Sequence, residues 1–198
     1  MKPFNHLKSL MVGLSTLVVT LPLVGCGGDT DGPLSNLYGI YEVTTWNENE
    51  AACDSDGASV LAEKIEKFLV VKEQEFIVRF VAAEGCESLE ACREVVADEA
   101  INLFGGYIFN AGSDTDGWNG SSASASSSGG ETCTGIFNQY TLTSPESGVV
   151  ELVKQTHEVT EVGRDSEDFC DTDEVTSRGP SEPCQSREVI RARLVEGI

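Results

Sequence analysis

The chain has 198 residues, with 33 acidic and 13 basic side chains, and its formal net charge at pH 7 is −20. This length corresponds to one domain with room for an insertion. The acidic excess argues against nucleic acid as a partner, because phosphates are bound by Lys and Arg. It also repels anionic lipid headgroups, so we expect the folded part to stand away from a membrane surface.

Residues 1–25 have the pattern of a secretory signal peptide. Lys2 and Lys8 precede an apolar segment that runs from Leu10 to Val24 and ends next to Gly25. A basic start, a short apolar run and a small residue at the cleavage site are the parts of such a peptide. The run is shorter than the about 20 residues that a spanning helix needs, so we expect export and cleavage.

The residues Leu23-Val24-Gly25-Cys26 resemble the lipobox of bacterial lipoproteins. The resemblance implies that Cys26 carries diacylglycerol on its sulfur and, after cleavage, an acyl chain on its nitrogen. Several chains, at about 0.8 kcal/mol per buried CH₂, make a stable membrane anchor. The resemblance also implies a place in the bacterial cell envelope. We expect the outer membrane, because Gly27 stands where some inner-membrane lipoproteins carry aspartate as a retention signal. An ordinary signal peptide, with Cys26 as a further disulfide candidate, is the alternative.

Residues 26–36 would then be the lipidated cysteine and a flexible polar tether, followed by a single β domain over residues 37–198. The stretch Tyr38–Trp46 is rich in aromatic and β-branched residues and predicts the first strand. Within residues 66–83 we expect two strands, joined by a turn at residues 72–74. A change to helical spacing, with Ser88 as the N-cap, predicts one short amphipathic helix near residues 88–100.

Further strands are expected in the second half of the chain. A short one is predicted at residues 107–110. Residues 111–131 are rich in Ser, Gly and Ala, which cannot offset the entropy of ordering, so we expect a mobile surface loop there. Residues 132–162 predict a hairpin that turns at residues 145–148. In the last strand, Ile190, Ala192 and Leu194 alternate with Arg191 and Arg193, which predicts one dry and one wet face.

These elements predict a mainly β fold with one short helix. Seven or eight sequential strands form an antiparallel meander, which limits its exposed edges by closing as a barrel or a two-layer sandwich. In a closed meander the first and last strands are antiparallel neighbours. We therefore expect the residues that follow the first strand to lie close to those that precede the last.

The cysteines beyond Cys26 are even in number, which in an exported chain predicts disulfide bonds. A zinc site is disfavoured, because the chain has no C-x-x-C pair and few histidines. Closure of the meander favours a Cys53–Cys184 bond. The full expected pairing is Cys53–Cys184, Cys86–Cys92 and Cys133–Cys170, and the alternative is Cys170–Cys184 with Cys53–Cys133.

The sequence Gly39-Ile40-Tyr41 on the first strand, with Arg191 and Arg193 on the last, is similar to the lipocalin pattern. In lipocalins the tryptophan of a Gly-x-Trp motif on the first strand is covered by an arginine of the last, and here Tyr41 stands in place of that tryptophan. The resemblance implies a lipocalin-like barrel in which Arg191 or Arg193 stacks on Tyr41 and caps the closed end. The chain as a whole also resembles uncharacterised cysteine-bearing envelope lipoproteins, a likeness that implies no activity.

Several D-x-D-G turns raise calcium as a cofactor, because Ca²⁺ is bound by carboxylate and carbonyl oxygens. The best candidate ligands are Asp114, Asp116 and Asn119. The spacing does not fit an EF-hand loop, and the alternative is a set of Asx turns in which each Asp bonds its own backbone. Beyond calcium we expect no cofactor.

An enzyme is not expected. His157, with Glu158 and Glu161 close by in the sequence, could be cast as a base with carboxylate partners, but the chain contains no G-x-S-x-G or H-E-x-x-H motif. The expected function is that of a lipid-anchored interaction or structural module that contacts the membrane through its anchor and another protein through its domain. A lipocalin-like carrier of a small apolar ligand is the alternative.

Overall fold

The computed structural model describes residues 37–50, 53–75, 79–98, 106–127, 132–164 and 170–198. The expected signal peptide, the lipobox with Cys26, and the tether lie outside these residues. The described residues all belong to one compact unit, Asp31–Ile198. None of the helices in the described part of the chain is both long and apolar enough to span a membrane.

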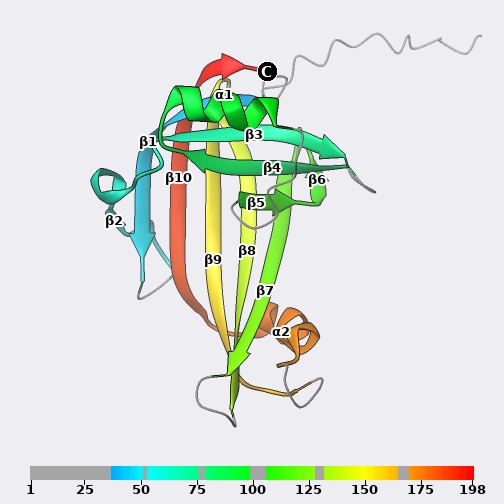
Figure 1. The fold of residues 1–198 in the computed structure, drawn as a ribbon. Coiled ribbons are helices and arrows are strands. Elements are labelled where there is room, and N and C mark those ends of the chain that lie inside the picture. The colour runs from blue at the N-terminus through cyan, green and yellow to red at the C-terminus, as the bar shows by residue number, and fades with distance from the viewer. Residues whose placement is uncertain (1–36, 51–52, 76–78, 99–105, 128–131, 165–169) are drawn as a thin grey trace, which may run out of the picture. The chain divides into compact units, whose positions relative to one another are not determined.

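The fold is mainly β, as predicted (Figure 1). Strands dominate the described residues, and two α-helices and two short 3-10 turns connect them. In chain order the elements are β1 (Gly39–Asn49), β2 (Ala58–Ser59), η1 (Leu61–Glu63), β3 (Phe68–Glu75), β4 (Arg79–Cys86), α1 (Leu89–Ala97), β5 (Gly106–Phe109), β6 (Ala111–Ser113), β7 (Gly117–Ser127), β8 (Cys133–Glu146), β9 (Val149–Val162), α2 (Thr172–Arg178), η2 (Gly179–Ser181) and β10 (Cys184–Gly197).

The strands form one antiparallel sheet in the order β5-β4-β3-β1-β10-β9-β8-β7-β6, with β2 paired to β1. The strands at the two ends of this order, β5 and β6, are consecutive in the chain. β5 pairs with β4 at one end, and β6 pairs with β7 at the other. Between them the amide of Asn110 donates to the carbonyl of Asn119 at 3.0 Å. The sheet is therefore nearly closed into a barrel, and the expectation that the first and last strands are antiparallel neighbours is confirmed by the pairing of β1 with β10.

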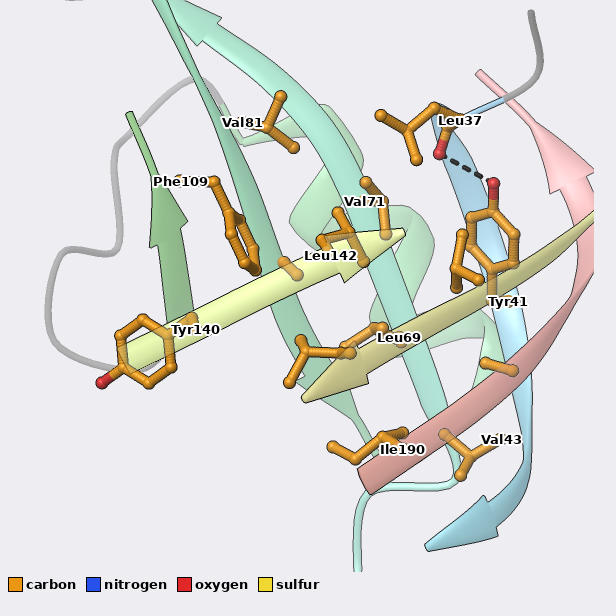
Figure 2. Close-up of a cluster of buried hydrophobic side chains, with 14 of the residues drawn as sticks. Leu37, Tyr41, Val43, Leu69, Val71, Val81, Phe109, Tyr140, Leu142 and Ile190 are labelled. Carbon is orange, nitrogen blue, oxygen red and sulfur yellow. Dashed lines mark hydrogen bonds between the residues drawn. The ribbon is translucent and has the colours of Figure 1, made fainter. Parts of the chain in front are cut away.

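The main core fills one end of the barrel interior, where β3, β4 and β5 lie across the long strands β8 to β10 (Figures 1 and 2). Side chains alternate between the two faces of each strand, and those on the inward face form this core. Among them are Leu142, Leu152 and Ile190, which are at most 1% exposed. Tyr41 also points into this core, and its hydroxyl donates to the carbonyl of Leu37 at 2.7 Å. Burial raises the pKa of the Tyr41 hydroxyl. This end of the barrel is a packed core.

Two helices cover smaller clusters outside the barrel. The expected helix is confirmed as α1, and the Ser88 side chain accepts a hydrogen bond from the amide of Ala91. Its Cys92 packs with Ile40 and Val70. Helix α2 covers the far ends of the long strands with Val175, which packs against Phe137 and Val159.

Two local expectations were wrong. The turn predicted at residues 72–74 is part of β3, which pairs with β4 through residues 80–82. Lys72 is tolerated there because its amine donates to the carbonyls of Val95 and Asp98 at the end of α1, at 2.7 and 3.1 Å. The predicted loop at residues 111–131 forms β6 and β7 over its described part, residues 111–127, and residues 128–131 lie outside the described residues. The small residues of β7 are ordered by backbone pairing with β8 from Trp118 to Ser127.

Three disulfides join Cys53 to Cys184, Cys86 to Cys92, and Cys133 to Cys170, with Cα–Cα distances of 5.9, 5.5 and 5.8 Å. They follow the full expected pairing rather than the alternative, and the Cys53–Cys184 bond is the one that closure of the meander favoured. The Cys53–Cys184 bond fastens the loop after β1 to the start of β10. The Cys133–Cys170 bond fastens the segment before α2 to β8.

Candidate functional site

The barrel interior changes from apolar to polar along its long strands. On β10 the inward positions are Ala192 and Ile190 in the core, followed by Glu188 and Ser186. The same inward row on β9 passes from Leu152 to Lys154, and on β8 it passes from Leu142 and Tyr140 to Asn138. Because the strand period is two, these polar side chains share the concave face with the core above them. We call this surface the concave groove: Trp46, Glu48, Lys64, Glu66, Tyr107, Ser122, Asn138, Tyr140, Lys154, Thr156, Ser186 and Glu188.

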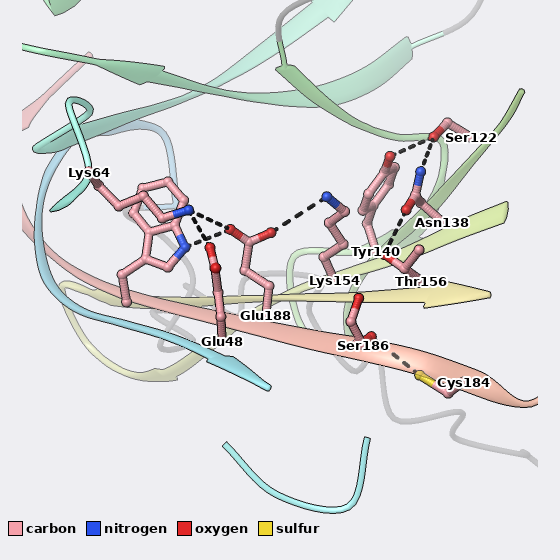
Figure 3. A network of polar contacts seen from close by, with 11 residues as sticks. Glu48, Lys64, Ser122, Asn138, Tyr140, Lys154, Thr156, Cys184, Ser186 and Glu188 are labelled. Carbon is pink, nitrogen blue, oxygen red and sulfur yellow. Dashed lines mark hydrogen bonds and ion pairs between the residues drawn. The ribbon is translucent and has the colours of Figure 1, made fainter. Parts of the chain in front are cut away.

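Glu188 is the centre of a charged network in the groove (Figure 3). Its carboxylate accepts a hydrogen bond from Trp46 Nε1 at 2.6 Å and lies 3.6 Å from Lys154 Nζ and 4.0 Å from Lys64 Nζ. Lys64 also forms an ion pair with Glu48 and lies 4.5 Å from the ring centroid of Trp46. Side chains from β1, β9, β10 and the segment after η1 therefore hold one another in place.

A second network, of uncharged groups, continues across β7, β8 and β9. The hydroxyls of Tyr140 and Ser122 are 2.6 Å apart. The Asn138 amide donates to the Ser122 hydroxyl at 3.3 Å and accepts from the Thr156 hydroxyl at 2.9 Å. In Figure 3 the Lys154 amine lies next to Tyr140, so the two networks meet at that point.

Tyr107, on β5, is a third aromatic side chain of the groove, beside Trp46 and Tyr140. Its ring meets that of Tyr140 edge to face, with centroids 5.2 Å apart. Burial raises the pKa of its hydroxyl, and the charge of Glu188 adds to this effect. The Tyr107 hydroxyl therefore stays protonated and able to donate. It makes no hydrogen bond to a described residue.

Two adjoining cavities lie in the groove. The larger has a volume of about 390 Å³, and its walls include Trp46, Glu66, Tyr107 and Tyr140. The smaller, of about 180 Å³, lies toward the end of β1, and Thr156 and Ser186 are in its wall. Both cavities are bordered by Lys154 and Glu188. Together they form a polar, preorganised site at the open end of the barrel.

The carboxylates of Asp114 and Asp116, two of the candidate calcium ligands, accept hydrogen bonds from neighbouring side chains. Asp114 accepts hydrogen bonds from Trp118 Nε1 at 2.9 Å and from the Tyr38 hydroxyl at 3.3 Å. Asp116 accepts from the Ser113 hydroxyl at 2.9 Å within the β6–β7 turn, and Asn119 is a paired residue of β7. No group of three or more His, Cys, Asp or Glu with metal-binding geometry occurs in the described ranges. These carboxylates bond to their own turn and its neighbours.

The expected arginine cap over Tyr41 was wrong. Arg191 and Arg193 are exposed and lie on the opposite face of β10 from the inward Ile190 and Ala192. Arg191 instead pairs with Glu151, with Nε 2.5 Å from the carboxylate. The alternation that makes β10 amphipathic places both arginines outside, whereas Tyr41 points into the core. The one cation–aromatic contact found among the described residues is that of Lys64 with Trp46, at the other end of β1.

His157 is buried, with 7% of its surface exposed, beneath the end of η2. Its Nδ1 donates to the carbonyl of Glu182 at 2.8 Å, and its Nε2 has no partner among the described residues. Its ring lies 6.0 Å from that of Phe137, measured between centroids, on the face of the sheet away from the groove. Its described contacts do not include the carboxylates of Glu158 or Glu161.

The groove residues were missed in the sequence, although a signal for them was present. Glu188 stands two positions before Ile190, and Lys154 stands two positions after Leu152. A charged residue that continues the inward row of a strand marks the place where a core ends and an accessible interior begins.

No protein-family model matches this chain, and neither the curated proteins nor the solved structures contain a match to it.

Proposed function

We propose that this chain is a bacterial envelope lipoprotein, anchored through acyl chains on Cys26 in the outer membrane, and that its β domain is an interaction module. The lipobox at residues 23–26 supports the anchor. The disulfides support an oxidising compartment, since such bonds persist outside the reducing cytosol. The excess of acidic side chains supports a domain that stands off the lipid headgroups.

The observation that carries the proposal is the contrast between the two ends of the barrel. One end is filled by Tyr41, Leu142, Leu152 and other apolar side chains. The other opens into the concave groove, where ion pairs and hydrogen bonds fix the positions of the polar groups. Preorganised polar groups in a concavity are the usual form of a binding site, because little entropy is lost when they bind. The groove is the contact surface of the module.

A carrier of a small apolar ligand is the second candidate, and the nearly closed sheet favours it. Such a carrier keeps an apolar cavity, whereas the cavities of the concave groove have charged walls. Mass spectrometry of an organic extract of the purified protein separates the two functions. A stoichiometric apolar molecule in the extract would support the carrier. Its absence, from protein to which no lipid was added during purification, would support the module.

The anchor is tested by metabolic labelling with a fatty acid. Cells that produce the chain are expected to incorporate labelled palmitate into it and to keep it in the membrane fraction. A Cys26→Ala variant is expected to lose the label and to leave the membrane fraction. Equal labelling of the variant, or an unmodified cysteine in the intact mass of the natural protein, would refute the anchor.

The contact surface is tested by photo-crosslinking in cells. A photoreactive phenylalanine analogue replaces Ile136, which is 38% exposed and lies on the inward row of β8 near the groove. The matched control replaces the exposed Arg193 on the outer face of β10. Adducts from position 136 but not from position 193 are expected. Adducts of equal yield, or from position 193 alone, would contradict a role for the groove.

A further inference from the structure

The wall of the larger cavity carries balanced charge. Lys64 and Lys154 face Glu66 and Glu188, so the positive and negative side chains are equal in number. Glu188 holds both lysines within 4.0 Å. An anionic ligand would compete with Glu188 for these amines, and a cationic ligand would be repelled by them. The balance favours a ligand without net charge.

The same wall has unused hydrogen-bonding capacity. The Tyr107 hydroxyl can donate and accept, and it bonds to no described residue. No hydrogen bond or ion pair of the Glu66 carboxylate is found in the described part of the chain, so it can accept. The Lys154 amine has three donors and, among the described residues, a single ion-pair partner, at 3.6 Å. Donors and acceptors thus alternate around the cavity, which suits a ligand whose own groups both donate and accept. Hydroxyl groups have that property.

Aromatic surface lies beside these polar groups. The half-buried ring of Tyr107 stands edge to face with Tyr140, and Trp46 lies in the same wall. A ligand with C–H groups between its hydroxyls could pack against these rings while bonding to the polar side chains. A fully polar ligand would leave this aromatic surface without contact.

The groove is also longer than its larger cavity. The cavities of about 390 and 180 Å³ meet at Lys154 and Glu188. The second is bordered by the Thr156 and Ser186 hydroxyls and by side chains of both charges, which are Glu48, Glu50, Glu188, Lys154 and Arg187. We propose that the concave groove binds a neutral saccharide of more than one ring, with Tyr107, Lys154 and Glu188 as contact residues. The proposal rests on the function given above, since it names the ligand of the same groove.

Tryptophan fluorescence tests this assignment in the full-length lipoprotein, held in a zwitterionic detergent that has no sugar headgroup. The chain has two tryptophans. Trp118 is bonded to Asp114 in the β6–β7 turn, so a Trp118→Phe variant leaves Trp46 as the reporter in the groove. The probes are maltotriose, cellotriose and tri-N-acetylchitotriose, compared with trigalacturonate, spermidine and palmitate. A saturable change of Trp46 emission with at least one neutral trisaccharide, and none with the other probes, is expected.

Tyr107→Phe, made in the Trp118→Phe background, removes the unpaired hydroxyl and is expected to weaken saccharide binding by about five- to tenfold, the loss of one net hydrogen bond. Tyr38→Phe is the matched control, because its hydroxyl bonds to Asp114 in the β6–β7 turn. It should leave binding unchanged. Equal affinities of the Tyr107 and Tyr38 variants would overturn the proposal.

A response only to the charged or apolar probes, or to no probe, would also overturn the saccharide assignment. If the crosslinks from position 136 then persisted, the groove would remain a contact surface with a ligand of another class. If those crosslinks were absent too, the proposed function would fall together with its ligand.

Discussion

The disulfide between Cys53 and Cys184 should contribute more to stability through the unfolded chain than either of the others. It closes a loop of 131 residues, against 37 for Cys133–Cys170 and 6 for Cys86–Cys92. In the chain-entropy treatment these loops correspond to about 5, 4 and 2 kcal/mol at 25 °C. Cys53 and Cys184 are both only half-buried, so replacing them with alanine removes little packing.

Urea unfolding of Cys53→Ala/Cys184→Ala provides the assay. The free energy of unfolding is expected to fall by about 5 kcal/mol. The m-value should rise, because the opened chain exposes more surface when it unfolds. Cys86→Ala/Cys92→Ala is the control. Its sulfurs are buried, so it loses packing as well, but its short loop should leave the m-value unchanged. A loss below about 2 kcal/mol with an unaltered m-value in the first variant would refute the reasoning.

Three further outcomes follow from contacts away from the groove. Gly135→Ala would place a Cβ 2.2 Å from Val175 Cγ2, and we expect a loss of about 1–3 kcal/mol in urea unfolding; Gly197→Ala, where a Cβ meets nothing within 4 Å, should be neutral. Lys72→Met removes the donor to the carbonyls of Val95 and Asp98 and should cost about 2 kcal/mol, read as faster amide exchange in α1. The pKa of Glu174 is lowered by the hydrogen bond from Arg178 and then by that from the Gly163 amide. Its stabilising contribution is therefore present above the ordinary carboxyl pKa and is lost as pH falls through the lowered value. Protection of the α2 amides, taken relative to the intrinsic exchange rate at each pH, should fall on acidification, and Glu174→Gln should reduce that dependence.

Closure of the barrel was predictable because it follows from local patterns. Period-two alternation located β1, β8, β9 and β10, and a sequential antiparallel meander leaves few ways to satisfy its edges. Pairing of the first and last strands then placed Cys53 near Cys184. Helix α1 was also predictable, since Ser88 stands as an N-cap immediately before a change of period.

Other features depend on tertiary contacts that no local pattern contains. Strand β7 has the composition of a linker, and it is ordered by its full-length pairing with β8. Lys72 looked like a turn residue because its partners, the last carbonyls of α1, are more than twenty residues away in the chain. The arginine cap failed because the resemblance considered residue types and took no account of the side of β10 that Arg191 and Arg193 occupy.

The groove required knowledge of register. Trp46, Lys64, Lys154 and Glu188 come from four segments that are far apart in sequence, and their proximity follows from the pairing of β1 with β10 and of β10 with β9. A charged residue on an inward row was visible in each strand separately. The sequence of each strand could not show that these rows meet at one end of the barrel.

Hydroxyl-radical footprinting of intact cells, compared with the purified lipoprotein, tests the groove as contact surface most directly. Ile136, near the groove, and Val195, on the final strand, are aliphatic side chains with 38% and 48% of their surface exposed. We predict that Ile136, together with the half-buried Tyr107, loses reactivity in cells, whereas Val195 keeps it. Equal reactivity of Ile136 in cells and in purified protein, or protection of Val195 alone, would contradict the account.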